Sequence, residues 1–177
     1  MPDQLLEQDA VAQAAALAAR RVSAVELLKA ALARHAETHK TLNAVVNADP
    51  ERAIEQARAV DDARSRGEPL GPLASVPMSV KDTFDVAGMA ASSGLAHFRR
   101  RMVGDAAAVS AARQAGAVIW GKTNVPVMAA DWQTTNALYG TSKNPWDVTR
   151  TTGGSSGGAA AALAARVTAL EIGSDIG

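Results

Sequence analysis

The sequence predicts an α/β protein with a mixed, largely parallel sheet core flanked by helices, preceded by an N-terminal helical region. From residue 76 onward, short apolar segments typical of strands alternate with alanine-rich segments typical of helices. This alternation indicates a parallel sheet with helices on its faces. Residues 1–68 carry helical patterns instead, so we expect a helical region over residues 1–68 and an α/β core over residues 69–177.

Three helices are expected in the N-terminal region. Residues 9–21 are rich in alanine and have a loose apolar face. Ser23 and Glu26 have the spacing of a capping box, in which each side chain bonds the backbone N–H of the other residue, and a leucine-rich helix follows. Asp49-Pro50-Glu51 begins a third helix, since proline is tolerated in a first turn, and we expect it to end at Gly67.

The next elements are two short strands separated by a helix. Residues 76–80 follow a loop rich in glycine and proline and read as a buried strand, with Lys81 at its end. Residues 105–115 predict a helix that stops at Gly116, and residues 118–120 predict a second strand. Strand ends are where α/β folds place their chemistry, so Lys81 is a candidate functional residue. A solvent-facing lysine is the competing interpretation.

Residues 151–177 read TTGGSSGGAAAALAARVTALEIGSDIG and form the most informative stretch. They join a Gly/Ser loop, an alanine-rich helix, a strand over residues 167–172 and a second glycine-containing turn. Glycine allows a positive φ or close approach of a ligand to the backbone. Because the helix follows the loop at once, its free N–H groups favour negative charge near Ser155 and Ser156.

Known glycine-rich loops fit this stretch only in part. The G-x-S-x-G nucleophile elbow needs an Asp and a His later in the chain, whereas the histidines all come earlier: His35, His39 and His97. We interpret His35 and His39 as part of a solvated helix face. A phosphate loop needs a lysine where Ala159 stands, and the dinucleotide fingerprint needs glycine in place of Ser155. On the residues alone, a structural turn or flexible linker is as well supported as a functional loop.

Composition excludes several function classes. The chain has 18 basic and 18 acidic residues, which gives no indication of a nucleic-acid or membrane partner. It has no cysteine, so disulfides, a thiol nucleophile and cysteine metal sites are excluded. The first residues lack the basic-then-apolar form of a signal peptide, and no apolar run is long enough to span a bilayer. We expect a cytoplasmic protein that needs no metal and no cofactor.

Taken together, the motifs of residues 77–177 resemble the amidase signature family. They are Val80-Lys81-Asp82, Gly121-Lys122-Thr123-Asn124, Tyr139-Gly140, Asn144-Pro145-Trp146, Arg150, the GGSSGG loop and the final GSDIG. The resemblance implies an amidase-signature fold, here incomplete, and hydrolysis of the carboxamide C–N bond of linear amides through an acyl-enzyme. It also implies a small-molecule amide substrate. In such a family the N-terminal helices often take part in dimer contacts, so the resemblance is compatible with a homodimer.

The resemblance assigns roles within a Ser–Ser–Lys triad that has no histidine. Lys81 corresponds to the base and Ser155, preceded by a cis peptide bond, to the bridging serine; the acyl-forming serine falls two residues beyond Gly177. Oxyanion or substrate contacts are expected from the turn at Ile176 and Gly177 and from the channel wall at Ala129. Residues expected to support the site are Gly153, Gly154, Ser156, Gly157, Ser174 and Asp175.

Two departures from the family pattern affect what we expect of this chain. It ends before the acyl-forming serine, so we expect these 177 residues alone to hydrolyse no amide and to fold poorly. Arg166 stands where a glycine often ends the alanine-rich helix, and a positive φ there would cost on the order of 1 kcal/mol.

Two alternative functions stay open. The first is the glutamine-hydrolysing subunit of an aminoacyl-tRNA amidotransferase, although residues 130–134, ADWQT, look more like the stand-alone amidases. The second is a non-catalytic remnant that acts as a binding or assembly module.

Overall fold

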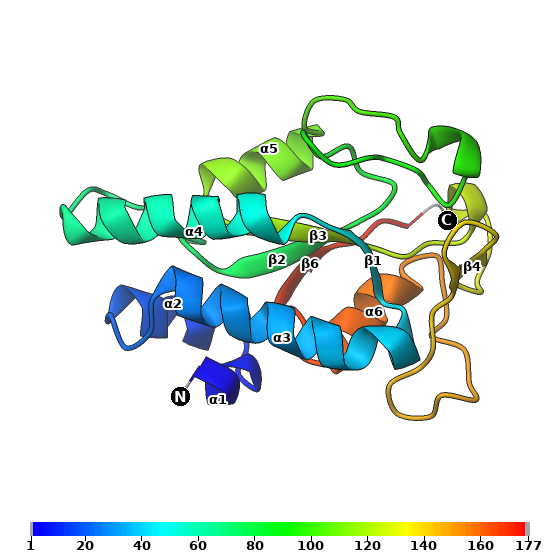
Figure 1. Ribbon diagram of the computed structural model, residues 1–177, viewed down its shortest axis with the longest axis horizontal. Coiled ribbons are helices and arrows are strands. Elements are labelled where there is room, and N and C mark those ends of the chain that lie inside the picture. The colour runs from blue at the N-terminus through cyan, green and yellow to red at the C-terminus, as the bar shows by residue number, and fades with distance from the viewer. Residues whose placement is uncertain (1, 176–177) are drawn as a thin grey trace.

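The computed structural model describes residues 2–175, which form a four-stranded mixed sheet between helices and a separate two-stranded sheet (Figure 1). The four-stranded sheet has the strand order β1-β3-β2-β6. Strands β2, β3 and β6 run parallel to one another, and β1 is antiparallel to β3. The elements are α1 (Pro2–Leu6), α2 (Ala10–Ala18), α3 (Ala24–Leu42), β1 (Val45–Ala48), α4 (Pro50–Ser65), β2 (Pro77–Lys81), η1 (Ala96–Phe98), α5 (Ala107–Gln114), β3 (Val118–Thr123), η2 (Val127–Ala129), β4 (Thr135–Asn136), β5 (Gly140–Thr141), α6 (Gly157–Ala164) and β6 (Leu170–Ile172).

The predicted α/β class with a largely parallel sheet is confirmed, with one strand that the sequence did not indicate. Strand β1 lies within the first 68 residues, which we expected to contain helices, and it forms the antiparallel edge of the sheet beside β3. Its four residues are too few to show a clear period of two. They also lead directly into Asp49, the N-cap of α4, so the helix signal dominates this part of the sequence.

Helix boundaries follow the capping signals closely. Both bonds of the capping box between Ser23 and Glu26 are present at the start of α3. Helix α4 begins at Pro50 and gives way to Gly67, whose φ is +73°. Helix α5 begins two residues later than expected because the Asp105 carboxylate accepts from the Ala87 N–H instead of capping the helix. Arg166, after α6, has a φ of +57°, the conformation that glycine would adopt more easily.

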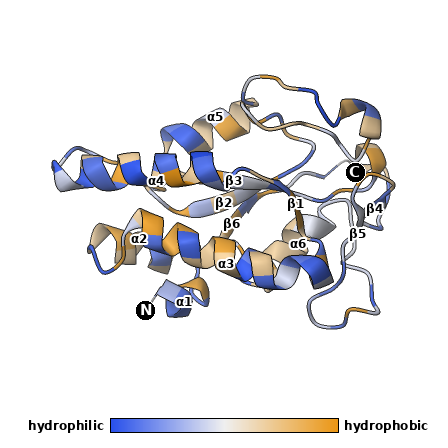
Figure 2. Ribbon diagram, viewed as in Figure 1, coloured by the Kyte–Doolittle hydropathy of each residue, from blue (hydrophilic) through white to orange (hydrophobic). Residues whose placement is uncertain are grey.

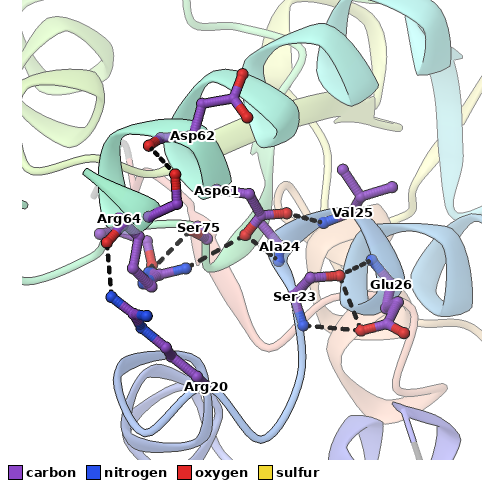
Figure 3. Close-up of polar contacts among 11 residues, drawn as sticks. Arg20, Ser23, Ala24, Val25, Glu26, Asp61, Asp62, Arg64 and Ser75 are labelled. Carbon is purple, nitrogen blue, oxygen red and sulfur yellow. Dashed lines mark hydrogen bonds and ion pairs between the residues drawn. The ribbon is translucent and has the colours of Figure 1, made fainter. Parts of the chain in front are cut away.

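Asp61 of α4 ties the N-terminus of α3 to the rest of the chain. Figure 3 shows its carboxylate directed at the first N–H groups of α3: the Ala24 N–H donates to Oδ1 at 2.8 Å and the Val25 N–H to Oδ2 at 3.2 Å. Arg64 lies 3.4 Å from the same carboxylate and also bonds Ser75, just before β2. Apart from its contacts with α3 and Ser75, α4 is largely hydrophilic along its length (Figure 2).

Two apolar clusters lie on the two sides of the sheet. The larger one joins α1, α2, α3, α4 and α6 to Trp120 of β3, and the smaller one packs α5 against β2 and β3 (Figure 1). His35 belongs with the first of these: its ring lies 5.4 Å from that of Trp120, and burial lowers its pKa to about 4. The prediction of a solvated face is therefore only partly right for His35, because the helix turns this residue toward the sheet and leaves it half-buried. His39, one turn later, is exposed.

Candidate active site

Lys81 is the last residue of β2, and its side chain is fully buried at the carboxyl end of the parallel strands. Its Nζ atom lies 2.7 Å from Ser155 Oγ, 2.9 Å from the carbonyl oxygen of Ser174 and 3.0 Å from Ser174 Oγ. Burial lowers the pKa of this lysine, because the charged form is disfavoured away from water, and the nearby Asp175 opposes the shift. The structure thus brings together Lys81, Ser155 and Ser174 from three separate segments.

The number of contacts bears on the protonation state of Lys81. A charged ammonium has three N–H donors, whereas a neutral amine has two donors and one lone pair. The Ser174 carbonyl oxygen can only accept, so it takes one N–H. The two hydroxyls can each donate or accept, and one of them can therefore donate to the lone pair of a neutral Lys81. The surroundings accommodate the neutral form without leaving an unpaired group.

The Gly/Ser loop holds Ser155 in place by close backbone packing. The peptide bond between Gly154 and Ser155 is cis, as the resemblance predicts. A side chain at Gly154 would meet the backbone of residues 131–133, with its Cβ 2.8 Å from the Asp131 carbonyl oxygen. At Gly157 a Cβ would lie 2.2 Å from Thr134 Oγ1, the same atom that accepts from the Gly157 N–H at 3.1 Å. Gly153 also bonds Thr134, through its carbonyl oxygen.

The second turn is tied to the first through Ser156. Its hydroxyl donates to the Ser174 carbonyl oxygen at 3.1 Å, and the same hydroxyl accepts from the Ser174 N–H at 3.4 Å. Asp175 is exposed and acts on Lys81 through its charge. The two residues expected at the oxyanion turn, Ile176 and Gly177, lie outside the described residues.

Ala129 lies in η2, a short turn just before residues 131–133. Ala129 is buried, and both it and Met128 have a positive φ, 56° and 53°. Residues 131–133, which follow directly, form the backbone that packs on Gly154. The exposed side chains of this stretch include the apolar Val127, Met128 and Trp132 and, beside them, the polar Asp131 and Gln133.

A buried ion pair lies beside the site, and the sequence patterns gave it no role. Asp82 follows Lys81 directly, and its Oδ1 lies 2.8 Å from Nζ of Lys122; both side chains are fully buried. Lys122 comes from the GKTN motif and lies opposite Val80 in the pairing of β2 with β3. The motif was visible in the sequence, but the pairing of its lysine with Asp82 depends on strand register, which no local pattern fixes.

Glu171 of β6 is a second group that the sequence did not single out. Its carboxylate accepts from the hydroxyls of Ser79 and, at 2.9 Å, Thr123. Burial raises the pKa of Glu171 to about 8, and the two hydroxyls moderate that rise. A period-of-two pattern in β6 would have pointed to this side chain, but the strand has only three residues.

We expect Glu171 to make stability fall as the pH rises. Its folded-state pKa of about 8 is above the ordinary value of 4.5, so the folded protein binds the proton more tightly than the unfolded one. The stabilisation is complete below pH 4.5 and is lost as the pH rises through 8. Chemical denaturation gives the free energy of unfolding at each pH. Between pH 4.5 and pH 8 and above, this free energy should fall in the wild type relative to Glu171→Gln by on the order of a few kcal/mol. The same pH dependence in both proteins would contradict a raised pKa for Glu171.

Comparison with known proteins identifies the class. A family model described as Amidase matches residues 26–177, and the chain therefore belongs to the amidase signature family, which confirms the resemblance. A relative from Acidothermus cellulolyticus, whose name makes it one of the subunits of glutamyl-tRNA(Gln) amidotransferase, is 44% identical over 98% of this chain and 34% of its own length. The chain thus spans about a third of the relative that it matches.

Two solved structures share the fold. The first is described as a vestigial protein complex that reveals the evolutionary origins of an s-triazine catabolic enzyme; it aligns with a TM-score of 0.91 and 38% identity over 95% of this chain and 37% of that one. The second, a 6-aminohexanoate cyclic dimer hydrolase, aligns with a TM-score of 0.85 and 34% identity over 94% of this chain and 33% of that one. Among residues 2–175, no helix is long and apolar enough to cross a bilayer.

Proposed function

We propose that this chain carries the lysine and the bridging serine of an amide hydrolase that works through an acyl-enzyme. The observation that supports this most directly is the 2.7 Å contact between Nζ of the fully buried Lys81 and Oγ of Ser155. A lysine can act as a base only when neutral, and burial favours that form. Membership in the amidase signature family supports the same reaction class.

The proposed relay moves one proton along three side chains. Neutral Lys81 accepts the proton of the Ser155 hydroxyl, and Ser155 accepts the proton of the acyl-forming serine, which the family resemblance places two residues beyond Gly177. That serine attacks the amide carbon, and the resulting oxyanion takes hydrogen bonds from backbone N–H groups, for which Ile176 and Gly177 are the proposed donors. The relay then reverses and protonates the departing amine, and water hydrolyses the acyl-enzyme.

Replacing Ser155 by alanine tests this relay. The protein to use is the product of the complete open reading frame that encodes this chain, assayed for ammonia release from small carboxamides. We expect Ser155→Ala to lower kcat/KM by about 10²–10⁴-fold, because Lys81 then has no path to the nucleophile. Ser65→Ala is the matched control, since the exposed Ser65 hydroxyl donates to the Asp62 carbonyl oxygen of its own helix, α4, far along the chain from the site. Unchanged turnover in Ser155→Ala would contradict the proposal.

The second candidate function is glutamine hydrolysis for an aminoacyl-tRNA amidotransferase. The names of the relatives favour it, because two relatives at 44% identity are named as subunits of glutamyl-tRNA(Gln) amidotransferase. The ADWQT segment favours the stand-alone amidases, as does the likeness to a hydrolase of known structure. Turnover of glutamine alone among the amides tested, together with a partner subunit that copurifies, would decide for the amidotransferase.

Some expectations drawn from the sequence remain predictions. We propose a cytoplasmic location and a small-molecule amide substrate. We also propose that residues 1–177 alone hydrolyse no amide, because the acyl-forming serine is not among them.

A further inference from the structure

The buried pair of Asp82 and Lys122 is the centre of a hydrogen-bonded network that the proposed relay does not use. Besides pairing with Asp82, Lys122 donates to the Ala90 carbonyl oxygen at 3.0 Å. The other carboxylate oxygen of Asp82 accepts from the Ser92 hydroxyl, and the Asp82 carbonyl oxygen accepts from the Ser93 N–H at 3.4 Å. The pair therefore fixes residues 90–94, which we name the bracing loop.

The bracing loop in turn contacts the segment that borders the Gly/Ser loop. The Ser93 carbonyl oxygen accepts from the Met128 N–H at 2.8 Å, at the point where Met128 takes its positive φ. Gly94 packs on Asn136, where an added Cβ would lie 3.2 Å from Asn136 Cβ. The bracing loop thus touches the chain on both sides of residues 131–133, which lie against Gly154.

We propose that Asp82, Lys122 and Ser92 are positioning residues that hold residues 127–133 as one wall of the substrate site. This inference rests on the proposed amide hydrolysis and adds to it the part that holds the substrate. The wall exposes the apolar side chains of Val127, Met128 and Trp132, of which Trp132 is 82% exposed. Asp131 and Gln133 are exposed as well, and the Asp131 carboxylate accepts from the Gln133 N–H at 3.0 Å. The apolar side chains of the wall suit amides with an apolar substituent long enough to reach them. A buried ion pair is well suited to a positioning role, because each charged side chain holds the other in place. Such a pair adds little net stability of its own.

Ser92→Ala tests the proposal while leaving the ion pair intact. The substitution removes the hydroxyl that joins Asp82 to the bracing loop and to the Gly94 N–H. We expect the Met128 amide hydrogen to exchange at least about tenfold faster. The Met128 N–H donates to the Ser93 carbonyl oxygen, and Ser93 loses a neighbouring anchor when the hydrogen bond from Ser92 to the charged Asp82 is removed. In the complete protein, KM for an amide with a large apolar acyl group should rise about tenfold, while kcat for this substrate stays within about twofold. For acetamide, which is too small to reach the wall, both KM and kcat should stay within about twofold.

Thr168→Val is the matched control. Thr168 is also buried, and its hydroxyl donates to Leu170 and Pro77 at the opposite end of β2. It should leave exchange at Met128 and both kinetic constants unchanged. Tyr139→Phe is a second variant that disturbs Ser92 from outside, since the Ser92 side chain interacts with the Tyr139 hydroxyl and lowers its pKa against the effect of burial. It should act in the same direction as Ser92→Ala.

The outcomes separate this inference from the proposed function. Unchanged exchange at Met128 in both Ser92→Ala and Tyr139→Phe would overturn the inference, as would equal losses for the large and the small amide. Faster exchange at Met128 in a protein that hydrolyses no amide would support the positioning role and overturn the proposed function instead.

Discussion

Replacing Lys81 by methionine is expected to reduce kcat/KM for amide hydrolysis by about 10³-fold in the product of the complete open reading frame. Methionine keeps the length and apolar character of the side chain, so the packing at the end of β2 is retained while the base is removed. Lys29→Met is the control, because Lys29 is exposed on α3. Activity of Lys81→Met within about tenfold of the wild type would refute the role of Lys81 as base.

The pH dependence gives a second test of the same residue. In the proposed relay, activity requires the neutral amine, so kcat/KM of the wild type is expected to rise with pH until Lys81 is deprotonated. Burial lowers the pKa of Lys81 below its ordinary value of 10.5, so the midpoint of the rise is expected below that pH. Lys81→Arg keeps a positive charge that is not lost in this range, and it should be inactive across the profile. A pH-independent wild type, or an active Lys81→Arg, would contradict a relay through a neutral amine.

Most of the fold could be predicted because its signals are local. The capping box of Ser23 and Glu26, the Asp49-Pro50 start of α4 and the glycines that end helices each act within a few residues. Strand β1 and the partial burial of His35 escaped prediction for a common reason. Both depend on packing against β3, which is distant in sequence: Val45 of β1 pairs with Thr123, 78 residues further along the chain.

For the candidate site, too, some features could be predicted from the sequence and others could not. The glycines and serines of the loop and the lysine at the end of β2 could be selected from the sequence, through the family resemblance. The contact of Lys81 with Ser174, the hydrogen bonds of the Glu171 carboxylate and the partner of Lys122 could not, because each joins side chains from different strands or turns. Strand order and register decide which polar side chains share a face, and the short strands here carry too little pattern to fix either.

Removing one partner of the buried ion pair should have a large effect on stability, although the intact pair adds little net stability. Lys122→Met leaves Asp82 as an uncompensated buried charge with one hydroxyl partner, Ser92, and Asp82→Asn leaves Lys122 without its counterion. Each single substitution is expected to lower the free energy of unfolding by about 3–5 kcal/mol. Chemical denaturation measures this directly, and the exposed pair of Arg66 and Glu68 provides the control, since Arg66→Ala should change stability little.

The double variant Asp82→Asn, Lys122→Met distinguishes the effect of the two charges on stability from the effect of side-chain packing. It removes both charges, so no buried ion is left unpaired, and much of the lost stability should return. Burial lowers the pKa of Lys122 and Asp82 opposes that shift, so in Asp82→Asn alone the lysine is expected to lose its proton more readily. If the double variant is as unstable as the sum of the two single variants, the charges do not interact and the pair contributes through packing alone. A stable double variant that still shows faster exchange at Met128 would mean that the pair is retained for position and contributes little net stability.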